Sequence, residues 1–253
     1  MKKFATIIVI LLLQVSVVKA QFKEEAKVKK WRFSSIAIKV GPDFKQRHSN
    51  MSFQTMEKLV KNPAALHYDM KGFKQRNHFF SEMMGETVGT YVNFSKDING
   101  RFSREWQAGL NAYTYAEVYV DYEKEQVATD NYVGWCLLQN RFDLDVAHFV
   151  KYNHRRFGLF IGASGSLGTS FNDQVMLFDE EGTRGDNLKP VQITAARSTR
   201  FVYAHLIFGL SINLYKGLAF TYELKRGKGV QLGTDNQIAS RSGLVGLQYS
   251  FNK

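Results

Sequence analysis

Residues 199–225, TRFVYAHLIFGLSINLYKGLAFTYELK, decide the fold of this chain. The even positions from Val202 to Leu214 are apolar, and the even positions from Leu218 to Leu224 continue the pattern after the turn at 215–217. The odd positions are mostly small, polar or ionisable. A period of two is typical of β-strands, because successive side chains point to opposite faces of the pleat. The stretch therefore predicts a β-hairpin with one apolar face, which either packs on a second sheet or faces lipid.

The first twenty residues have the pattern of an export signal. Lys2 and Lys3 precede an apolar run over 4–18, and Val18-Lys19-Ala20 resembles a small-residue cleavage site. The run is shorter than the roughly 20 residues that a transmembrane helix needs. We therefore expect residues 1–20 to be a cleaved signal peptide, 21–32 to be a short charged periplasmic segment, and 33–253 to be the folded domain.

Charge and cysteine content narrow the class of protein. The formal net charge of the full chain is +11, and Cys136 is the only cysteine, which excludes an intrachain disulfide. An exported basic protein meets lipid headgroups and lipopolysaccharide phosphates rather than nucleic acid. We therefore expect outer-membrane lipids, with lipopolysaccharide among them, as partners.

Alternation recurs along the rest of the domain and predicts eight strands in all. They cover about 33–40, 87–94, 106–120, 133–152, 157–171, 202–214, 218–225 and 237–251. Connections after the second, fourth and sixth strands are short, and the others are long, including the loops expected over 41–85 and 172–198. This rhythm is typical of an up-and-down barrel with short turns on one side of a membrane. No proline falls inside these strands.

The inward faces of the predicted strands are polar. Their candidate interior residues are Lys39, Asn111, Glu117, Arg141, Asp143, Asp145, His205, Glu223, Lys225 and Gln248. A soluble barrel such as a lipocalin buries apolar groups inside, whereas here the apolar groups point outward. The pattern therefore predicts an all-β fold, an eight-stranded antiparallel up-and-down transmembrane β-barrel.

The chain resembles the small outer-membrane β-barrels of the OmpX/OmpA class. The resemblance rests on the leader, the alternating strands, the loop rhythm and the closing residues 246–251, GLQYSF. It implies that Tyr249 and Phe251 form a C-terminal insertion signal, which the barrel-assembly machinery recognises. Asn252 and Lys253 follow the last aromatic residue, which departs from the terminal-phenylalanine form. The resemblance implies a cell outer-membrane location and transfers no specific activity.

Charged residues inside so narrow a barrel must pair with one another or meet water. The predicted lumen charge network consists of Lys39, Glu117, Arg141, Asp143, Asp145, Glu223 and Lys225. It is interpreted as a salt-bridged plug, with a narrow ion path or solute pocket as the alternative. Paired carboxylates beside an arginine require no acid–base role. No cysteine pair or close His/Asp/Glu spacing predicts a metal site, and no cofactor is expected.

The long loop over 41–85 repeats a basic motif. Lys45 and Arg47 belong to one copy, and Lys74 and Arg76 to the other, so we expect this loop basic patch to contact an anionic partner. His148 lies on the predicted lipid face without a serine two residues away, so a lipid-modifying site is not indicated. The sequence predicts a non-enzymatic barrel that interacts through its loops, with an unknown protein as a possible partner. The alternatives are a lipid A-modifying enzyme, a narrow channel and a component of a secretion or assembly machine.

Overall fold

The computed structural model describes residues 30–47, 58–62, 73–75, 82–124, 131–181, 190–233 and 237–251. The expected signal peptide and residues 21–29 of the charged segment lie outside the described residues. Residues 31–253 group into one unit by their contacts. In the described part of the chain, no helix is long and apolar enough to cross a membrane.

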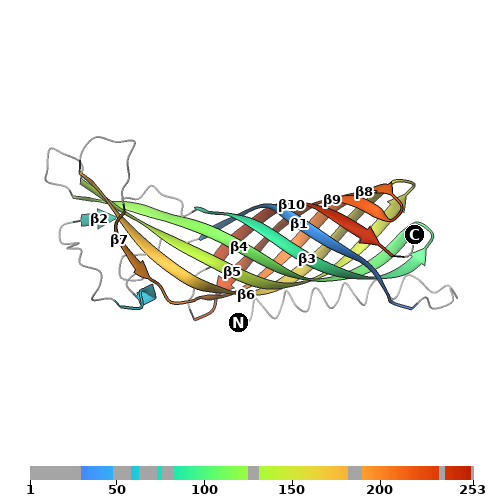
Figure 1. The fold of residues 1–253 in the computed structure, drawn as a ribbon, viewed down its shortest axis with the longest axis horizontal. Helices are drawn as coiled ribbons and strands as arrows, with labels where there is room; N and C mark the ends of the chain where they lie inside the picture. The colour runs from blue at the N-terminus through green and yellow to red at the C-terminus, as the bar shows by residue number, and fades with distance from the viewer. Residues whose placement is uncertain are drawn as a thin grey trace. The chain divides into compact units, whose positions relative to one another are not determined.

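Eight antiparallel strands close into a ring (Figure 1). They are β1 (Arg32–Arg47), β3 (Glu82–Asn99), β4 (Phe102–Lys124), β5 (Asn131–His154), β6 (Phe157–Glu181), β8 (Arg200–Tyr215), β9 (Leu218–Gln231) and β10 (Gln237–Ser250). Each strand pairs with the ring strand before it, and β10 returns to β1 from Ser35 opposite Ser250 to Arg47 opposite Ile238. The ring has no free edge, so the predicted eight-stranded up-and-down barrel is confirmed.

Three tight turns join strands at one end, which we call the short-turn end. At the first turn, the Asn99 side-chain oxygen accepts hydrogen bonds from the Arg101 and Phe102 amides at 3.1 and 2.9 Å. At the third, Lys216 and Gly217 both have positive φ, 35° and 85°, as a two-residue hairpin requires. The short turns expected from the sequence are therefore present. We call the opposite end of the strands the long-loop end.

Strand β1 is longer than the sequence predicted, because Gly41-Pro42 does not end it. Pairing with β3 continues through Gly41 and Pro42, whereas the register with β10 passes from Val40 to Asp43. The proline therefore faces β10, where the ladder of hydrogen bonds is interrupted. Because no partner is required there, the missing N–H of proline costs no hydrogen bond. The expected end of the first strand at residue 40 was therefore wrong, and Pro42 lies inside β1. Pro190 begins β7 (Pro190–Ala195), within the region expected to be a loop.

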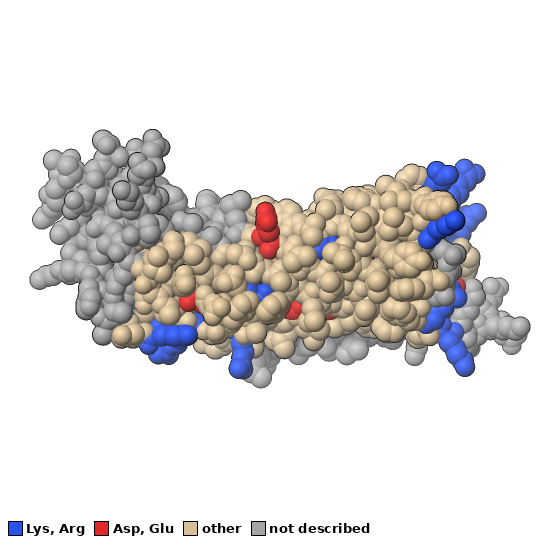
Figure 2. All heavy atoms as spheres, viewed as in Figure 1, with Lys and Arg blue, Asp and Glu red and all other residues tan. Residues whose placement is uncertain are grey.

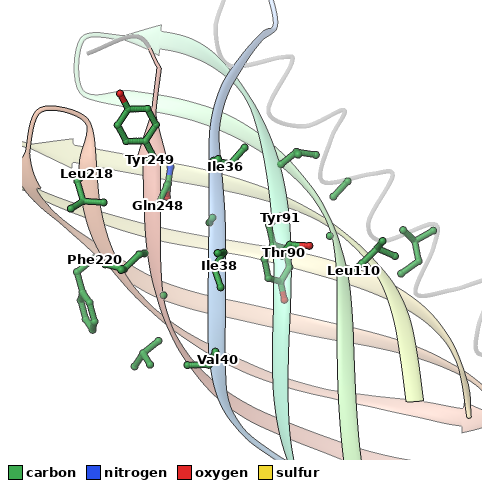
Figure 3. A pocket seen from close by; sticks show the side chains of 18 residues that line it. Ile36, Ile38, Val40, Thr90, Tyr91, Leu110, Leu218, Phe220, Gln248 and Tyr249 are labelled. Carbon is green, nitrogen blue, oxygen red and sulfur yellow. The ribbon is translucent and has the colours of Figure 1, made fainter. Parts of the chain in front are cut away.

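The barrel has inverted polarity. Large apolar side chains cover its outer wall, including Ile38 at 58% exposed, Leu110 at 61% and Leu159 at 60%. Figure 3 shows an apolar depression on this wall, lined by Ile36, Ile38 and Leu110 among others. In the space-filling view, Lys and Arg side chains gather at the short-turn end (Figure 2). A continuous apolar outer wall around a polar interior is the arrangement of a transmembrane barrel.

Strands β4, β5 and β6 extend at the long-loop end into regions that the sequence assigned to loops. The short strands β2 (Phe73–Gln75) and β7 (Pro190–Ala195) pair with β4 and β6 there. Within the loop expected over 172–198, the described residues 172–181 and 190–195 are thus strand. Beyond the apolar wall, the outward residues Asn172 and Gln174 of β6 are exposed and polar. We call this part, formed by the long-loop ends of β4–β6 with β2 and β7, the strand extension.

Candidate functional site

The interior has room for large side chains because glycines lie opposite many of them. Tyr91 faces Gly109, and Phe149 faces Gly162. A Cβ atom at either glycine would overlap the facing aromatic ring. Because an eight-stranded barrel is only wide enough for its side chains to fill it, these glycines allow the rings to lie against the wall.

Four charged residues form a mid-barrel cluster: Lys39, Asp145, Glu223 and Lys225. Lys39 Nζ lies 2.5 Å from a Glu223 oxygen, and Lys225 Nζ lies 2.5 Å from Asp145 and 3.3 Å from Glu223. Their side chains are at most 6% exposed. Two cations and two anions balance, which the cost of burying charge requires.

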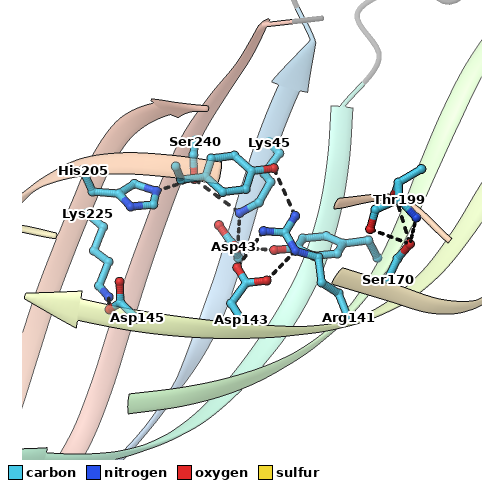
Figure 4. A network of polar contacts seen from close by, with 12 residues as sticks. Asp43, Lys45, Arg141, Asp143, Asp145, Ser170, Thr199, His205, Lys225 and Ser240 are labelled. Carbon is cyan, nitrogen blue, oxygen red and sulfur yellow. Dashed lines mark hydrogen bonds and ion pairs between the residues drawn. The ribbon is translucent and has the colours of Figure 1, made fainter. Parts of the chain in front are cut away.

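A second group, the loop-side cluster, lies nearer the long-loop end and consists of Asp43, Lys45, Arg141 and Asp143 (Figure 4). Arg141 donates two hydrogen bonds of 2.6 Å to the Asp143 carboxylate, in the bidentate arrangement. Lys45 lies 2.6 Å from Asp43, whose carboxylate also accepts a hydrogen bond from the Tyr115 hydroxyl. This cluster is likewise balanced in charge.

Aromatic residues pack around the loop-side cluster. Tyr115, Phe201, Tyr203 and Ile238 form a buried group. The Arg141 guanidinium carbon lies 4.4 Å from the Phe201 ring centre and 4.7 Å from that of Tyr203. Such stacking holds the guanidinium in place through cation–π attraction. Arg141 is only 1% exposed, so the cluster is a packed part of the interior.

Hydrogen-bonded amides continue the network toward the short-turn end. Gln107 accepts from Lys39 at 2.8 Å and donates to Asn93 at 2.8 Å. Asn93 and Gln248 both donate to the Ser35 hydroxyl, at 2.8 and 2.7 Å. Beside this ladder, Ala147, Phe149 and Ile207 form an apolar layer with Phe160 packed against it. The interior is therefore filled by ion pairs, amides and apolar groups in turn.

A serine and a histidine meet inside the barrel, but their setting does not suit catalysis. His205 Nε2 lies 3.0 Å from the Ser240 hydroxyl, which also accepts a hydrogen bond from Lys45 at 3.3 Å. Ser240 is 1% exposed and His205 8%, so a substrate has no approach. A nucleophile needs its base oriented by a third group, and His205 Nδ1 has no hydrogen-bond partner here. Among the described residues, no group of His, Cys, Asp or Glu could hold a metal ion.

One buried carboxyl lies in the strand extension, outside the apolar wall. Asp173 accepts hydrogen bonds from Ser170 at 2.5 Å and Gln139 at 2.8 Å, while its second oxygen has no partner. Burial raises the pKa of the Asp173 carboxyl above its usual range, although the two hydrogen bonds act in the opposite direction. The Ser170 hydroxyl also hydrogen-bonds the side chain and the backbone amide of Thr199. These bonds hold the residue that immediately precedes β8 in place.

The structure places most of the predicted network residues together and changes the predicted loop patch. Lys39, Arg141, Asp143, Asp145, Glu223 and Lys225 are all buried. Glu117 lies in β4 opposite Leu137. Lys45 is not in a loop, and its burial at 3% with Asp43 removes it from the patch, because β1 continues past Pro42. Arg47 and Lys74 lie in β1 and β2. Arg76 lies outside the described residues.

Sequence reasoning missed Asp43, Tyr115 and Tyr203 as members of the network. Asp43 and Lys45 keep the odd-numbered alternation of Lys39, and this signal could have been followed through the proline. The two residues of the expected insertion signal lie on the outer wall. Tyr249 is 47% exposed, and the Phe251 ring stacks on Phe33 with their centres 5.1 Å apart.

Comparison with known proteins gives a likeness of fold. No protein-family model matches the chain, and no curated protein matches it. Ail, the attachment invasion locus protein of Yersinia pestis, is 9% identical with a TM-score of 0.33, over 86% of this chain and 100% of that one. Neisserial surface protein A is 8% identical with a TM-score of 0.38, over 85% and 97%.

The outer membrane protease OmpT from Escherichia coli is 8% identical with a TM-score of 0.39, over 89% of this chain and 99% of that one. Identities and scores at this level identify no shared activity. The chain is similar in fold alone to small outer-membrane β-barrels, the class that its sequence resembles.

Proposed function

We propose that this chain is an integral outer-membrane protein whose closed barrel anchors the strand extension for contact with partners outside the cell. The filled interior carries this proposal. The mid-barrel cluster and the loop-side cluster are balanced in charge and buried, and Arg141 and Glu223 are each 1% exposed. A rigid, filled barrel suits an anchor better than a conduit or an enzyme with an open site.

Membrane fractionation tests the location and conductance tests the role. The barrel is expected in the outer-membrane fraction, resistant to an alkaline carbonate wash, with an unboiled band that shifts on heating. Reconstituted in planar bilayers, the protein is expected to give no steady conductance. Release by carbonate argues against the membrane location. Step conductance of the unaltered protein would contradict the proposed anchor role and support a narrow channel instead.

A lipid-modifying activity has a separate test. Mass spectra of lipopolysaccharide from cells without the gene are expected to match those of the parent strain. A mass difference that returns to normal when the gene is restored would make the protein an enzyme. The expectation rests on His205, which has a nearby hydroxyl but no exposed approach.

The partner-facing basic patch then consists of Arg47, Lys74 and Arg76, without Lys45. Its proposed partner is anionic, because all three residues are basic. Replacing all three with glutamine should reduce attachment of cells to an anionic surface such as heparin-coated beads. Replacing Arg101 and Arg156, at the short-turn end, should leave attachment unchanged.

Tyr249 and Phe251 are proposed as the insertion signal. Replacing both residues with alanine should therefore lower the amount of folded barrel in the membrane.

A further inference from the structure

Two arginines lie directly opposite each other on the outer wall of the barrel. Arg226 of β9 is the register partner of Arg241 of β10, and both side chains are exposed. Opposed side chains in an antiparallel pair have Cβ atoms about 5 Å apart, and like charges there are destabilising. Lys228, two residues further along β9, is also exposed and outward. We call Arg226, Lys228 and Arg241 the wall cation patch.

Among the described residues, the register neighbours of the wall cation patch are apolar. The row that contains the arginines continues to Leu206 of β8 on one side and Phe44 of β1 on the other, at 61% and 41% exposed. Lys228 lies between Ala204 and Ala239. Within the described part of the chain, none of the three cations has an ion-pair partner. Among the described residues, no carboxylate therefore offsets the repulsion between the two arginines.

The patch lies where the apolar wall ends. Along β9, the outward residues run from Leu218 through Phe220, Tyr222 and Leu224 to Arg226, and all lie on one face. Along β10, the outward row ends at Gly243 before Arg241. This boundary is on the long-loop side, where the phosphates of the outer leaflet would meet the barrel. Guanidinium groups bind phosphate bidentately, and their weak hydration suits an interface.

Gly243, which has no side chain, lies two residues from Arg241 on the same strand face. Gly243 lies opposite Leu224, and a Cβ atom placed there would lie 3.7 Å from a Leu224 methyl and 3.9 Å from the Tyr222 hydroxyl. The Tyr222 hydroxyl therefore borders the position that a Gly243 side chain would fill. It is a hydrogen-bond donor on the same outer face as the arginines, and the apolar wall for acyl chains continues from it along β9.

We propose that Arg226, Arg241 and Lys228 bind the phosphate of a lipid in the outer leaflet, a phosphorylated glycolipid of the lipopolysaccharide type. The inference rests on the proposed outer-membrane function, which alone brings this lipid to the long-loop side. Acyl chains lie along Leu224, Leu206 and Gly243, while the phosphate neutralises the opposed arginines. A lipid, rather than free phosphate, fits because the cations continue directly from the acyl-facing wall.

Lipid titration in detergent micelles tests the site without depending on cellular location. Delipidated protein is titrated with lipid A, and binding is followed by native mass spectrometry. The variant R226Q/R241Q is expected to bind lipid A about tenfold or more weakly, because two charge-assisted contacts are lost. The matched variant R101Q/R156Q removes two exposed arginines at the short-turn end and should bind as the unaltered protein does. A heat-shifted gel band shows that each variant is folded.

Several outcomes would overturn the proposal. Equal loss in both double variants would mean general charge attraction, and no loss in R226Q/R241Q would mean that the arginines do not bind. Inorganic phosphate is also added as a competitor. If it displaces bound lipid A as effectively as added lipid A does, the ligand is a phosphate and not a lipid. If R226Q/R241Q does not fold, R226K/R241K keeps the charge without the bidentate fork and should weaken binding; unchanged affinity would count against the guanidinium contacts. A protein that is absent from the outer membrane but still binds lipid A would contradict the proposed function and leave the proposed binding site standing.

Discussion

Asp143 lies directly opposite Gly168 on the inner face of the barrel, and its carboxylate occupies the space where a Gly168 side chain would begin. The same space borders Arg141 Nε, which donates to Asp143 at 2.6 Å. The bidentate pair of the loop-side cluster therefore depends on the absence of a Cβ atom on the neighbouring strand. Its geometry is set by β6 as much as by β5.

Gly168→Ala should destabilise the barrel, because the added methyl group displaces the Asp143 carboxylate from Arg141. Overpacking of this kind costs about 1–3 kcal/mol. The control is Gly165→Ala on the same strand, where the nearest atom is the Tyr203 carbonyl oxygen at 3.9 Å. Urea unfolding in detergent, followed by tryptophan fluorescence, compares the two. Equal midpoints for both variants would show that the pair tolerates displacement.

The ion pair between Asp145 and Lys225 should show the asymmetry of buried charge. Asp145→Asn removes one partner and leaves Lys225 with Glu223 alone, at 3.3 Å, which should cost about 3–5 kcal/mol. The double variant D145N/K225Q, in which neither position carries a charge, should recover part of that loss. The exposed pair of Arg32 and Asp97 is the control, and Arg32→Gln should change stability by at most about 1 kcal/mol. A double variant that is additive would argue that the two residues do not interact.

Much of the fold follows from the sequence because side-chain alternation and membrane polarity act together. The hairpin over 202–224 shows both, and the eight ring strands follow from the same pattern. Strand ends were less predictable. Gly41-Pro42 reads as a terminator, yet β1 passes through it, because the ladder with β10 is interrupted at that point.

The interior site could be predicted as a set of residues but not as pairs. Alternation places Lys39, Asp145 and Lys225 on inward faces, but the pairing of Asp145 with Lys225 joins residues 80 apart in sequence. The contacts between inward groups across the lumen depend on the tilt and stagger of the strands. The alternation within a single strand does not predict either quantity. The glycine partners of Asp143 and Tyr91 depend on register in the same way.

Asp173 should make the strand extension sensitive to pH. Its folded-state pKa is raised by burial, so the folded protein binds a proton more tightly than the unfolded chain does. The sign follows: the extension is more stable when pH is low and the carboxyl is protonated, and it loses stability as pH rises through the raised pKa. Asp173→Asn should abolish this dependence and leave the extension at least as stable at neutral pH.

Hydrogen exchange of the amides in β5 and β6 measures this effect. Residues near Gln139 and Ser170 should lose protection with rising pH in the unaltered protein, after correction for the intrinsic rate, and should not do so in the variant. The matched control is Asn172→Asp, which adds an exposed carboxyl next to Asp173 and should not abolish the dependence. The same pH response in Asp173→Asn would assign it to another group.

Leu110 offers a direct test of the lipid-facing wall. Its side chain is 61% exposed and points outward from β4. On the surface of a soluble protein, an exposed leucine can become arginine with little change in stability. On a wall facing the middle of a bilayer, the same substitution should cost about 2–4 kcal/mol. Leu110→Arg should therefore lower stability in lipid vesicles by that amount.

The control for Leu110→Arg is Glu86→Arg. Glu86 is exposed on β3 opposite Thr114, at a level where the wall already carries a charge, so its replacement should cost less than about 1 kcal/mol. Both variants are unfolded with urea in vesicles and in detergent. Because the cost at Leu110 arises from hydrocarbon, it should shrink when detergent and water replace the bilayer. A small and equal effect at both positions in vesicles would mean that the apolar wall does not face lipid.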